Sequence, residues 1–131
     1  MSNNLKKILY IEDDKDIAEL VSFALSELGG FDLLYCESGI EALEKMNDFE
    51  PQLILMDVMM PEMDGPSTLK SIKANNNYQH IPVIFITARV QSHEIEEYYA
   101  MGVDDVIVKP FDPISLPVQL SSCWEKANDR K

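Results

Sequence analysis

Several features that would mark other protein classes are missing from this 131-residue sequence. It has two cysteines, Cys36 and Cys123, which are too few for a disulfide framework and lack the spacing of a zinc site. No apolar run approaches the ~18 residues of a membrane span, and the start MSNNLKK lacks the apolar region of a signal peptide. We therefore predict a cytoplasmic protein with reduced thiols and no membrane partner.

Basic residues are also scarce. Lysine and arginine number 11 against 23 acidic residues, which gives a formal net charge of −12. Such a field repels phosphate backbones, so we expect no nucleic-acid partner. It favours cations or the basic surface of another protein.

The chain has the length of one domain and lacks any repeat, linker or low-complexity segment. Its 46% hydrophobic residues suffice for a buried core. We predict a single domain over residues 1–131, with an ordered core over about residues 6–127.

Short apolar runs alternate with amphipathic stretches along the chain. The apolar runs are typical of strands buried on both faces, and the stretches between them have helical spacing. Predicted strands cover residues 7–11, 31–36, 53–56, 83–86 and 106–108. Predicted helices cover residues 17–28, 38–46, 67–74 and 93–101, with a last helix starting at Asp112-Pro113.

Two of these helices carry specific local signals. The first has one apolar stripe and ends at Gly29-Gly30; its members are Ile17, Leu20, Val21, Ala24, Leu25 and Leu28. The last contains Pro117 at about its fifth position, where the missing N–H predicts a kink or a later start.

This alternation predicts an α/β fold with a five-stranded parallel sheet and helices on both faces. Because parallel crossovers are right-handed, few topologies remain. We favour the doubly wound, flavodoxin-like strand order 2-1-3-4-5.

Polar residues stand where four of the strands end. Residues 12–14 (Glu-Asp-Asp) follow the first strand, Asp57 ends the third, Thr87 ends the fourth and Lys109 ends the fifth. The carboxyl ends of parallel strands lie on one edge of the sheet, where open α/β sheets bind ligands. We therefore expect these side chains to form one pocket.

The residue types in this pocket suit phosphoryl transfer. Converging carboxylates need a cation, and an all-oxygen site beside a phosphate suits Mg²⁺. A carboxylate can also act as a nucleophile and form an aspartyl phosphate, with a lysine and a hydroxyl neutralising the phosphoryl oxygens. In the structural alternative, Lys109 only forms an ion pair with Asp57.

The segments KILYIEDD, LILMDVMMPEMDG, PVIFITA and GVDDVIVKPFDP resemble the receiver domains of two-component response regulators, and chemotaxis regulators in particular. The resemblance covers nearly the whole chain. It implies that Asp57 is the phosphoacceptor, that Thr87 donates to a phosphoryl oxygen and that Lys109 pairs with the phosphate. Ala88 matches the small residue that leaves room for the phosphoryl group.

The same resemblance implies a magnesium site. Asp13 would be a direct ligand, Glu12 would act through water, Asp57 would share the metal and Met59 would contribute its backbone carbonyl. The phosphodonor would be a histidine kinase or a histidine phosphotransfer protein. The domain would catalyse only its own phosphorylation and dephosphorylation, so we do not class it as an enzyme. We expect it to signal through protein–protein contacts with a downstream target.

Other acidic residues have simpler interpretations. We expect Asp14 to serve the N-terminus of the first helix, although it could assist the metal. Asp64 and Gly65 are expected to shape the turn after the active-site loop. Asp104 and Asp105 are expected to set loop geometry before the fifth strand.

The sequence departs from the family at Val106, where many receivers carry an aromatic switch residue. Tyr98 and Tyr99 could supply an aromatic surface nearby, although helical spacing places one of them in the core. Lys109-Pro110 resembles the family's cis peptide bond.

Two rival functions were weighed. A haloacid-dehalogenase-like phosphohydrolase needs a second Asp two residues after the nucleophile, where this chain has Met59. A receiver-like interaction module acting without phosphorylation is the remaining alternative. Since few residues follow the last predicted helix, we expect a stand-alone receiver without an output domain.

Overall fold

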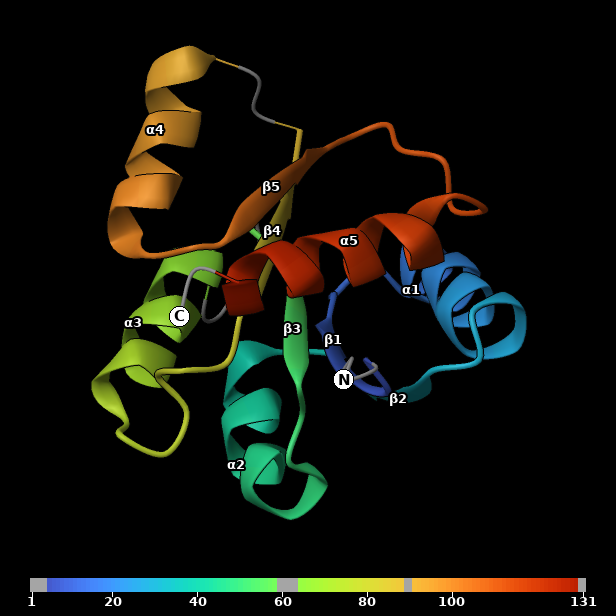
Figure 1. Ribbon diagram of the computed structural model, residues 1–131, viewed down its shortest axis with the longest axis horizontal. Coiled ribbons are helices and arrows are strands. Elements are labelled where there is room, and N and C mark those ends of the chain that lie inside the picture. The colour runs from blue at the N-terminus through green and yellow to red at the C-terminus, as the bar shows by residue number, and fades with distance from the viewer. Residues whose placement is uncertain (1–4, 59–63, 89–90, 130–131) are drawn as a thin grey trace.

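The computed structural model describes residues 5–58, 64–88 and 91–129 of the chain. Its centre is a five-stranded parallel sheet with the order β2-β1-β3-β4-β5 (Figure 1). The predicted doubly wound topology is therefore confirmed. The strands are β1 (Lys7–Ile11), β2 (Asp32–Cys36), β3 (Leu53–Asp57), β4 (Val83–Thr87) and β5 (Asp105–Val108).

Helices follow each strand in the order that the sequence pattern predicts. They are α1 (Lys15–Phe23) with a π-helical continuation η1 (Ala24–Leu28), α2 (Gly39–Phe49), α3 (Gly65–Ala74), α4 (Ser92–Met101) and α5 (Leu116–Asp129). In the described part of the chain, none of these helices has the length and apolarity needed to cross a membrane.

The sheet separates two hydrophobic cores. Consecutive residues of a strand point to opposite faces, so Leu9 belongs to one core and Tyr10 to the other. The first core is covered by α2, α3 and α4, and the second by α1, η1 and α5 (Figure 1). Trp124 of α5 packs into the second core and is 7% exposed. The buried side chains extend from Leu5 to Ala127.

The first helix differs from its prediction as a single regular helix. At Ala24 it widens into a π-helical turn, where the Gly29 N–H donates to the Ala24 carbonyl at 2.9 Å. The Ser26 hydroxyl donates to the Ser22 carbonyl at 2.6 Å, and such a side-chain bond competes with the regular backbone ladder. The predicted apolar stripe is also incomplete, because Leu20 and Leu28 are more than half exposed.

The last helix begins later than predicted. Asp112 does not cap it but closes a preceding turn, in which its carboxylate accepts from the Ile114 N–H at 3.0 Å. The helix starts at Leu116, which places Pro117 in the first turn. Because backbone N–H groups there have no intrahelical acceptor, Pro117 costs no helical hydrogen bond. The later start that Pro117 predicts is thus confirmed.

Three helices begin at residues whose side chains cap them, and the cap at Asp14 is the one expected above. Asp14 caps α1 by accepting from the N–H groups of Asp16 and Ile17. Ser38 accepts from the Glu41 N–H at the start of α2, and Asp64 accepts from the Ser67 N–H at the start of α3. These caps fix where each helix leaves the edge of the sheet.

Candidate functional site

Three carboxylates meet at the carboxyl edge of the sheet, as predicted. Glu12 and Asp13 follow β1, and Asp57 ends β3, the strand paired with β1. One oxygen of each carboxylate lies within 4.8 Å of the others. Glu12 and Asp57 are 1% and 4% exposed, whereas Asp13 is open to solvent. The inner part of the cluster, Glu12 and Asp57, is therefore buried, and its outer part, Asp13, is accessible to solvent.

Glu12 is held by its neighbours on two strands. The Tyr35 hydroxyl, from β2, donates to the Glu12 backbone carbonyl at 2.6 Å, and the Tyr10 hydroxyl lies 3.4 Å from Glu12 Oε1. The Asp14 N–H donates to Oε2 at 3.3 Å. Burial, and then the negative charge of Asp57, raises the pKa of Glu12 to about 7. The site thus resists carrying both carboxylate charges without a cation.

Within the part of the chain that the structure describes, Asp57 has one cationic partner. The Lys109 ammonium lies 3.0 Å from Asp57 Oδ1, and its side chain is 25% exposed. Burial raises the pKa of Asp57, while the hydrogen bond and charge of Lys109 act against that rise. The ion pair of the structural alternative therefore exists. It uses one ammonium against two buried carboxylates, so it leaves negative charge uncompensated.

Thr87 and Lys109 come from the ends of the next two strands. Val58 N–H donates to the Ile86 carbonyl at 3.1 Å, which aligns the end of β3 with that of β4. Lys109 N–H donates to the Thr87 carbonyl at 2.8 Å. Thr87 is fully buried, and Ala88 after it is exposed. The strand ends thus bring the predicted hydroxyl and lysine to the same edge as Asp57.

The donor set fits a divalent cation. Three oxygen ligands converge, two of them desolvated, and only one ammonium faces them among the residues that the structure describes. A hard ion such as Mg²⁺ prefers carboxylate oxygens and keeps waters on its open side, which the exposed Asp13 allows. Met59, the predicted backbone ligand, lies outside the described residues.

The start of α3 is anchored to the residue that follows β3. The Gly65 N–H donates to the Val58 carbonyl at 2.9 Å. A Cβ at Gly65 would lie 2.9 Å from the Val58 Cα and 3.1 Å from the Asp57 carbonyl oxygen, so only glycine fits without a shift. Gly65, with Asp64 as the cap of α3, thus places the start of α3 directly against the end of β3.

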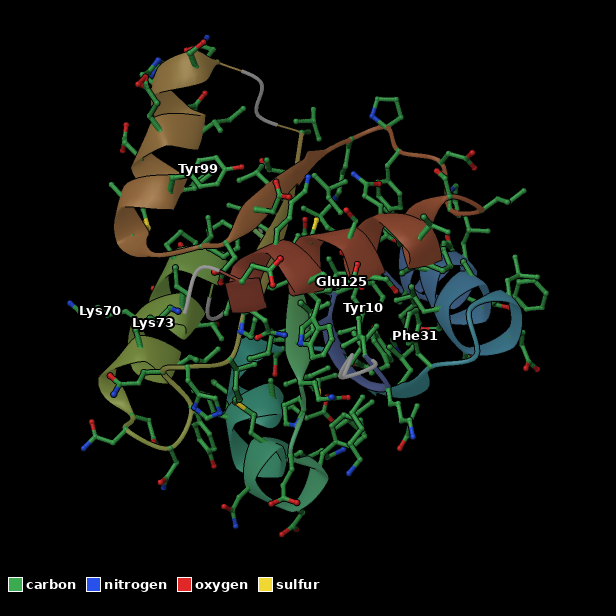
Figure 2. All side chains as sticks on the ribbon, in the orientation of Figure 1. Tyr10, Phe31, Lys70, Lys73, Tyr99 and Glu125 are labelled. Atoms are coloured by element: carbon green, nitrogen blue, oxygen red, sulfur yellow. The ribbon has the colours of Figure 1, made fainter. Side chains whose placement is uncertain are left out.

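Two tyrosines of α4 lie in the region around Val106. Tyr98 is buried in the first core, edge-on to Phe85 with ring centroids 5.2 Å apart, which confirms that one of the two tyrosines is core. Tyr99 reaches from α4 toward β5 (Figure 2), and its hydroxyl donates to Asp105 at 3.1 Å. Val106 is half-buried beside them.

The two aspartates at the start of β5, Asp104 and Asp105, have different roles. Asp104 accepts from the Val83 N–H at 2.9 Å and so fixes the loop, as predicted. Asp105 instead accepts from the Tyr99 hydroxyl, from the Val106 N–H at 2.8 Å and from the Cys123 thiol at 2.9 Å. We call this set the Asp105 clasp, because it joins α4, β5 and α5. Sequence analysis did not foresee it.

Sequence reasoning also missed the two tyrosines at Glu12. They are neighbours in the parallel register of β1 and β2, with ring centroids 5.8 Å apart. Tyrosines one residue before each strand end, on strands expected to pair, were the available signal. Burial raises the pKa of Tyr10, and it raises the pKa of Tyr35 to about 12, so both hydroxyls stay protonated donors.

The chain is similar to known signalling proteins. The sequence pattern of the family described as "Response regulator receiver domain" matches residues 8–121. The chemotaxis protein CheY1 of Helicobacter pylori (strain J99) is 35% identical over 115 residues, which cover 87% of this chain and 93% of that protein. A CpxR homolog of Haemophilus influenzae, a transcriptional regulatory protein, is 37% identical over 94% of this chain but 52% of its own length. The chain thus spans about half the length of that relative.

Solved structures agree with this similarity. The chemotaxis protein CheY4 of Vibrio cholerae superposes with a TM-score of 0.83 at 28% identity, over 91% of this chain and 98% of that one. The signal receiver domain of a histidine kinase from Syntrophus aciditrophicus superposes with a TM-score of 0.81 at 30% identity, over 92% and 91%. With the family pattern covering most of the sequence, the chain belongs to the response regulator receiver domains of two-component signalling systems.

Proposed function

We propose that this receiver accepts a phosphoryl group on Asp57 from a phosphohistidine of a histidine kinase or phosphotransfer protein. The observation that carries the proposal is the buried Asp57, which has Lys109 at 3.0 Å on one side and two further carboxylates within 4.8 Å on the other. In-line phosphoryl transfer requires a nucleophile with positive charge on both sides of the transferring group. Here Lys109 supplies one charge, and the carboxylate cluster could bind the metal ion that supplies the other.

The reaction uses the residues in distinct roles. An oxygen of Asp57 bonds to phosphorus while the phosphorus–nitrogen bond of the donor breaks, and the electron pair stays on the imidazole. The Lys109 ammonium pairs with Asp57 Oδ1 before the reaction, and during the transfer it pairs with the negatively charged phosphoryl oxygens. The Thr87 hydroxyl donates to one of these oxygens, and Ala88 leaves space for them.

Glu12, Asp13 and Asp57 would hold Mg²⁺, together with the Met59 carbonyl. The ion would neutralise charge on the transferring phosphoryl group. Tyr35 keeps the Glu12 backbone in place, which orients the carboxylate toward the cluster. Water later hydrolyses the aspartyl phosphate and releases inorganic phosphate, so the chain processes only itself. We propose that it is a cytoplasmic phosphoprotein that signals by changing its protein contacts.

The proposal is tested by intact-mass analysis after incubation with acetyl phosphate and Mg²⁺. We expect a gain of ~80 Da, the mass of one phosphoryl group in place of a proton, for the wild type. The gain should require Mg²⁺ and be absent from Asp57→Asn, which keeps the side-chain shape. If the wild type gains no mass and also fails to bind beryllofluoride, an interaction module that works without phosphorylation replaces this proposal.

A further inference from the structure

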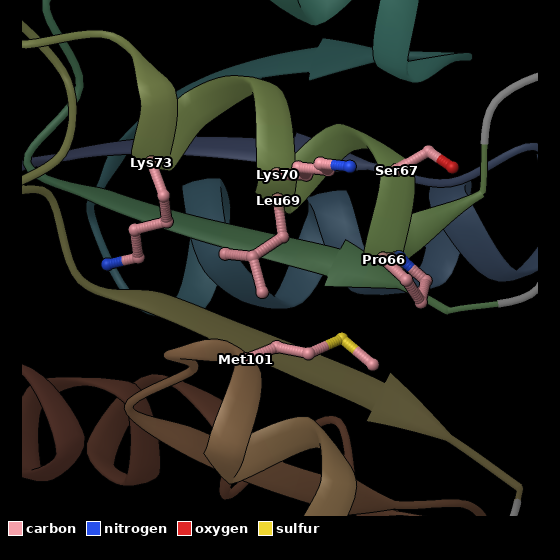
Figure 3. A pocket seen from close by; sticks show the side chains of 6 residues that line it. All are labelled: Pro66, Ser67, Leu69, Lys70, Lys73 and Met101. Atoms are coloured by element: carbon pink, nitrogen blue, oxygen red, sulfur yellow. The ribbon is translucent and has the colours of Figure 1, made fainter.

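A groove between α3 and α4 lies outside the phosphoryl site. It has a volume of about 390 Å³ and is lined by Pro66, Ser67, Leu69, Lys70, Lys73 and Met101 (Figure 3). Five of these residues come from α3, and Met101 comes from the last turn of α4. The groove is near the lower limit for small-ligand pockets, so it has room for about one large side chain rather than a cofactor.

The lining combines an apolar floor with a basic rim. Leu69 is buried and its side chain faces Met101 across the groove, while Met101 is 42% exposed (Figure 3). Lys70 and Lys73 stand one helical turn apart on the α3 side. Because methionine is flexible and polarisable, Met101 can adapt to an apolar group placed against it.

The charge of this rim is opposite to that of the molecule. The chain has a net charge of −12, and α3 is the one helix of the described residues without a carboxylate. Lys73 Nζ donates to the Gln79 carbonyl at 3.3 Å, and neither Lys70 nor Lys73 forms an ion pair with a carboxylate of the described residues. Two uncompensated ammonium groups beside an apolar floor select an anion that carries an apolar group.

From these observations we infer that the α3–α4 groove binds a segment of a partner protein with one large apolar side chain flanked by carboxylates. An apolar anchor inside a charged rim is the usual anatomy of a small protein–protein contact. This inference goes beyond phosphoryl transfer, since none of the groove residues belongs to the Asp57 site.

The test uses a capped peptide, acetyl-Asp-Phe-Leu-Asp-amide, titrated into the ¹⁵N-labelled full chain without Mg²⁺ or phosphodonor. We expect amide signals of Ser67, Lys70, Lys73 and Met101 to shift, with a Kd below about 1 mM. Replacing both lysines, Lys70→Glu with Lys73→Glu, should weaken binding about 10-fold or more. Both side chains lie at the surface, so thermal unfolding should be nearly unchanged.

A matched variant separates the groove from net charge. Lys15→Glu with Lys126→Glu makes the same charge change on α1 and α5, which cover the opposite face of the sheet. It should bind the peptide with the wild-type Kd. The inference is overturned if this variant weakens binding as much as the groove variant, or if no signals shift at several times 1 mM peptide.

Two further controls identify the ligand chemistry. The peptide with asparagine in place of both aspartates should bind at least about 10-fold more weakly. If phenylacetate alone binds as tightly as the peptide, the groove is a small-anion site and the inference fails. Because the titration contains no phosphodonor, neither result depends on whether Asp57 is phosphorylated.

Discussion

Two aspartates on strands that are separated by β4 have opposite surroundings. Asp57 ends β3, is 4% exposed, and shares its surroundings with Glu12, Asp13 and a single ammonium. Asp105 begins β5, is half-buried, and accepts from three neutral donors in the Asp105 clasp. Asp57 is therefore the more deeply buried of the two, and it is also the one that lies in a cluster of like charges.

The difference lies in the charge balance. The Asp105 carboxylate is a single charge with a hydroxyl, an amide and a thiol directed at it, which is a satisfied structural arrangement. The Asp57 cluster buries more negative charge than Lys109 can offset, which is unfavourable unless a cation or a phosphoryl reaction uses it. An incomplete charge balance, together with deeper burial, thus sets Asp57 apart as the candidate for chemistry.

The largest expected effect separates the two regions by chemistry. Lys109→Gln removes the ammonium at 3.0 Å from Asp57 Oδ1 and should slow phosphorylation by acetyl phosphate about 100-fold, as loss of one transition-state donor does. The rate is measured by intact mass over time at saturating Mg²⁺. Tyr99→Phe, which alters only the Asp105 clasp, should keep the wild-type rate. Equal rates for Lys109→Gln and the wild type would contradict a catalytic role for the lysine.

The second prediction concerns pH and the metal-free protein. The pKa of Glu12 rises from its ordinary value of 4.5 to about 7 on folding, so the folded chain binds this proton more tightly than the unfolded chain. Its contribution to stability is fully present below pH 4.5 and is lost as the pH rises through 7. We expect the free energy of unfolding to fall by on the order of 2 kcal/mol over this window relative to Glu12→Gln.

Urea unfolding of both proteins in EDTA at several pH values measures this difference. The pKa of Asp57 is also raised, so this carboxylate too lowers the free energy of unfolding as the pH rises. Because Asp57 interacts with Glu12, its contribution cancels only in part when the wild type is compared with Glu12→Gln. Saturating Mg²⁺ should favour the charged carboxylates and so reduce the fall in the free energy of unfolding between pH 4.5 and 7. A wild-type profile parallel to that of Glu12→Gln would refute the assignment of the effect to Glu12.

A smaller effect is expected for the tyrosine that holds Glu12. Tyr35→Phe deletes the 2.6 Å hydrogen bond to the Glu12 carbonyl and should raise the Kd for Mg²⁺ about 3- to 5-fold, the value of one hydrogen bond. Calorimetric titration of the unphosphorylated protein with Mg²⁺ measures it. Tyr78→Phe, a half-buried tyrosine packed on the other core, is the matched control and should leave the Kd unchanged. Similar shifts in both variants would assign the effect to general loosening.

The smallest effect tests the clasp itself. Tyr99→Phe removes one of the three donors to Asp105, on a side chain that is 45% exposed, and should lower the free energy of unfolding by about 0.5 kcal/mol. Burial and the Asp105 charge raise the pKa of Tyr99, so the lost donor is a neutral hydroxyl over the whole physiological range. Urea unfolding measures the change. A loss as large as that of a core substitution would mean that the clasp organises α4 rather than merely contacting it.

The sequence predicted most of the fold because strand burial and helix caps are local signals. The apolar runs located every strand to within a residue or two, and Asp14, Ser38 and Asp64 capped the helices expected after them. The start of α5 was predicted too early because an aspartate such as Asp112 can accept a backbone hydrogen bond in a turn as well as at the N-terminus of a helix. The π-helical turn at Ala24 was missed, since it depends on a hydroxyl that any serine in a helix could offer.

The site was predictable in part for a topological reason. Residues at the ends of parallel strands must share an edge, so Glu12, Asp57, Thr87 and Lys109 could be grouped before any contact was known. Contacts that cross between strands and helices were not predictable in this way. Tyr35 with Glu12 and Cys123 with Asp105 depend on register and side-chain direction, which no spacing along the chain encodes.

The single tryptophan gives the protein a built-in optical reporter. Trp124 sits in the second core beside Cys123, whose thiol belongs to the Asp105 clasp. Its indole is shielded from water in the folded state, so emission should shift to longer wavelength when α5 leaves the sheet. The fluorescence of the unlabelled chain therefore reports on the β5–α5 side of the molecule, about which the chemistry at Asp57 gives no direct signal.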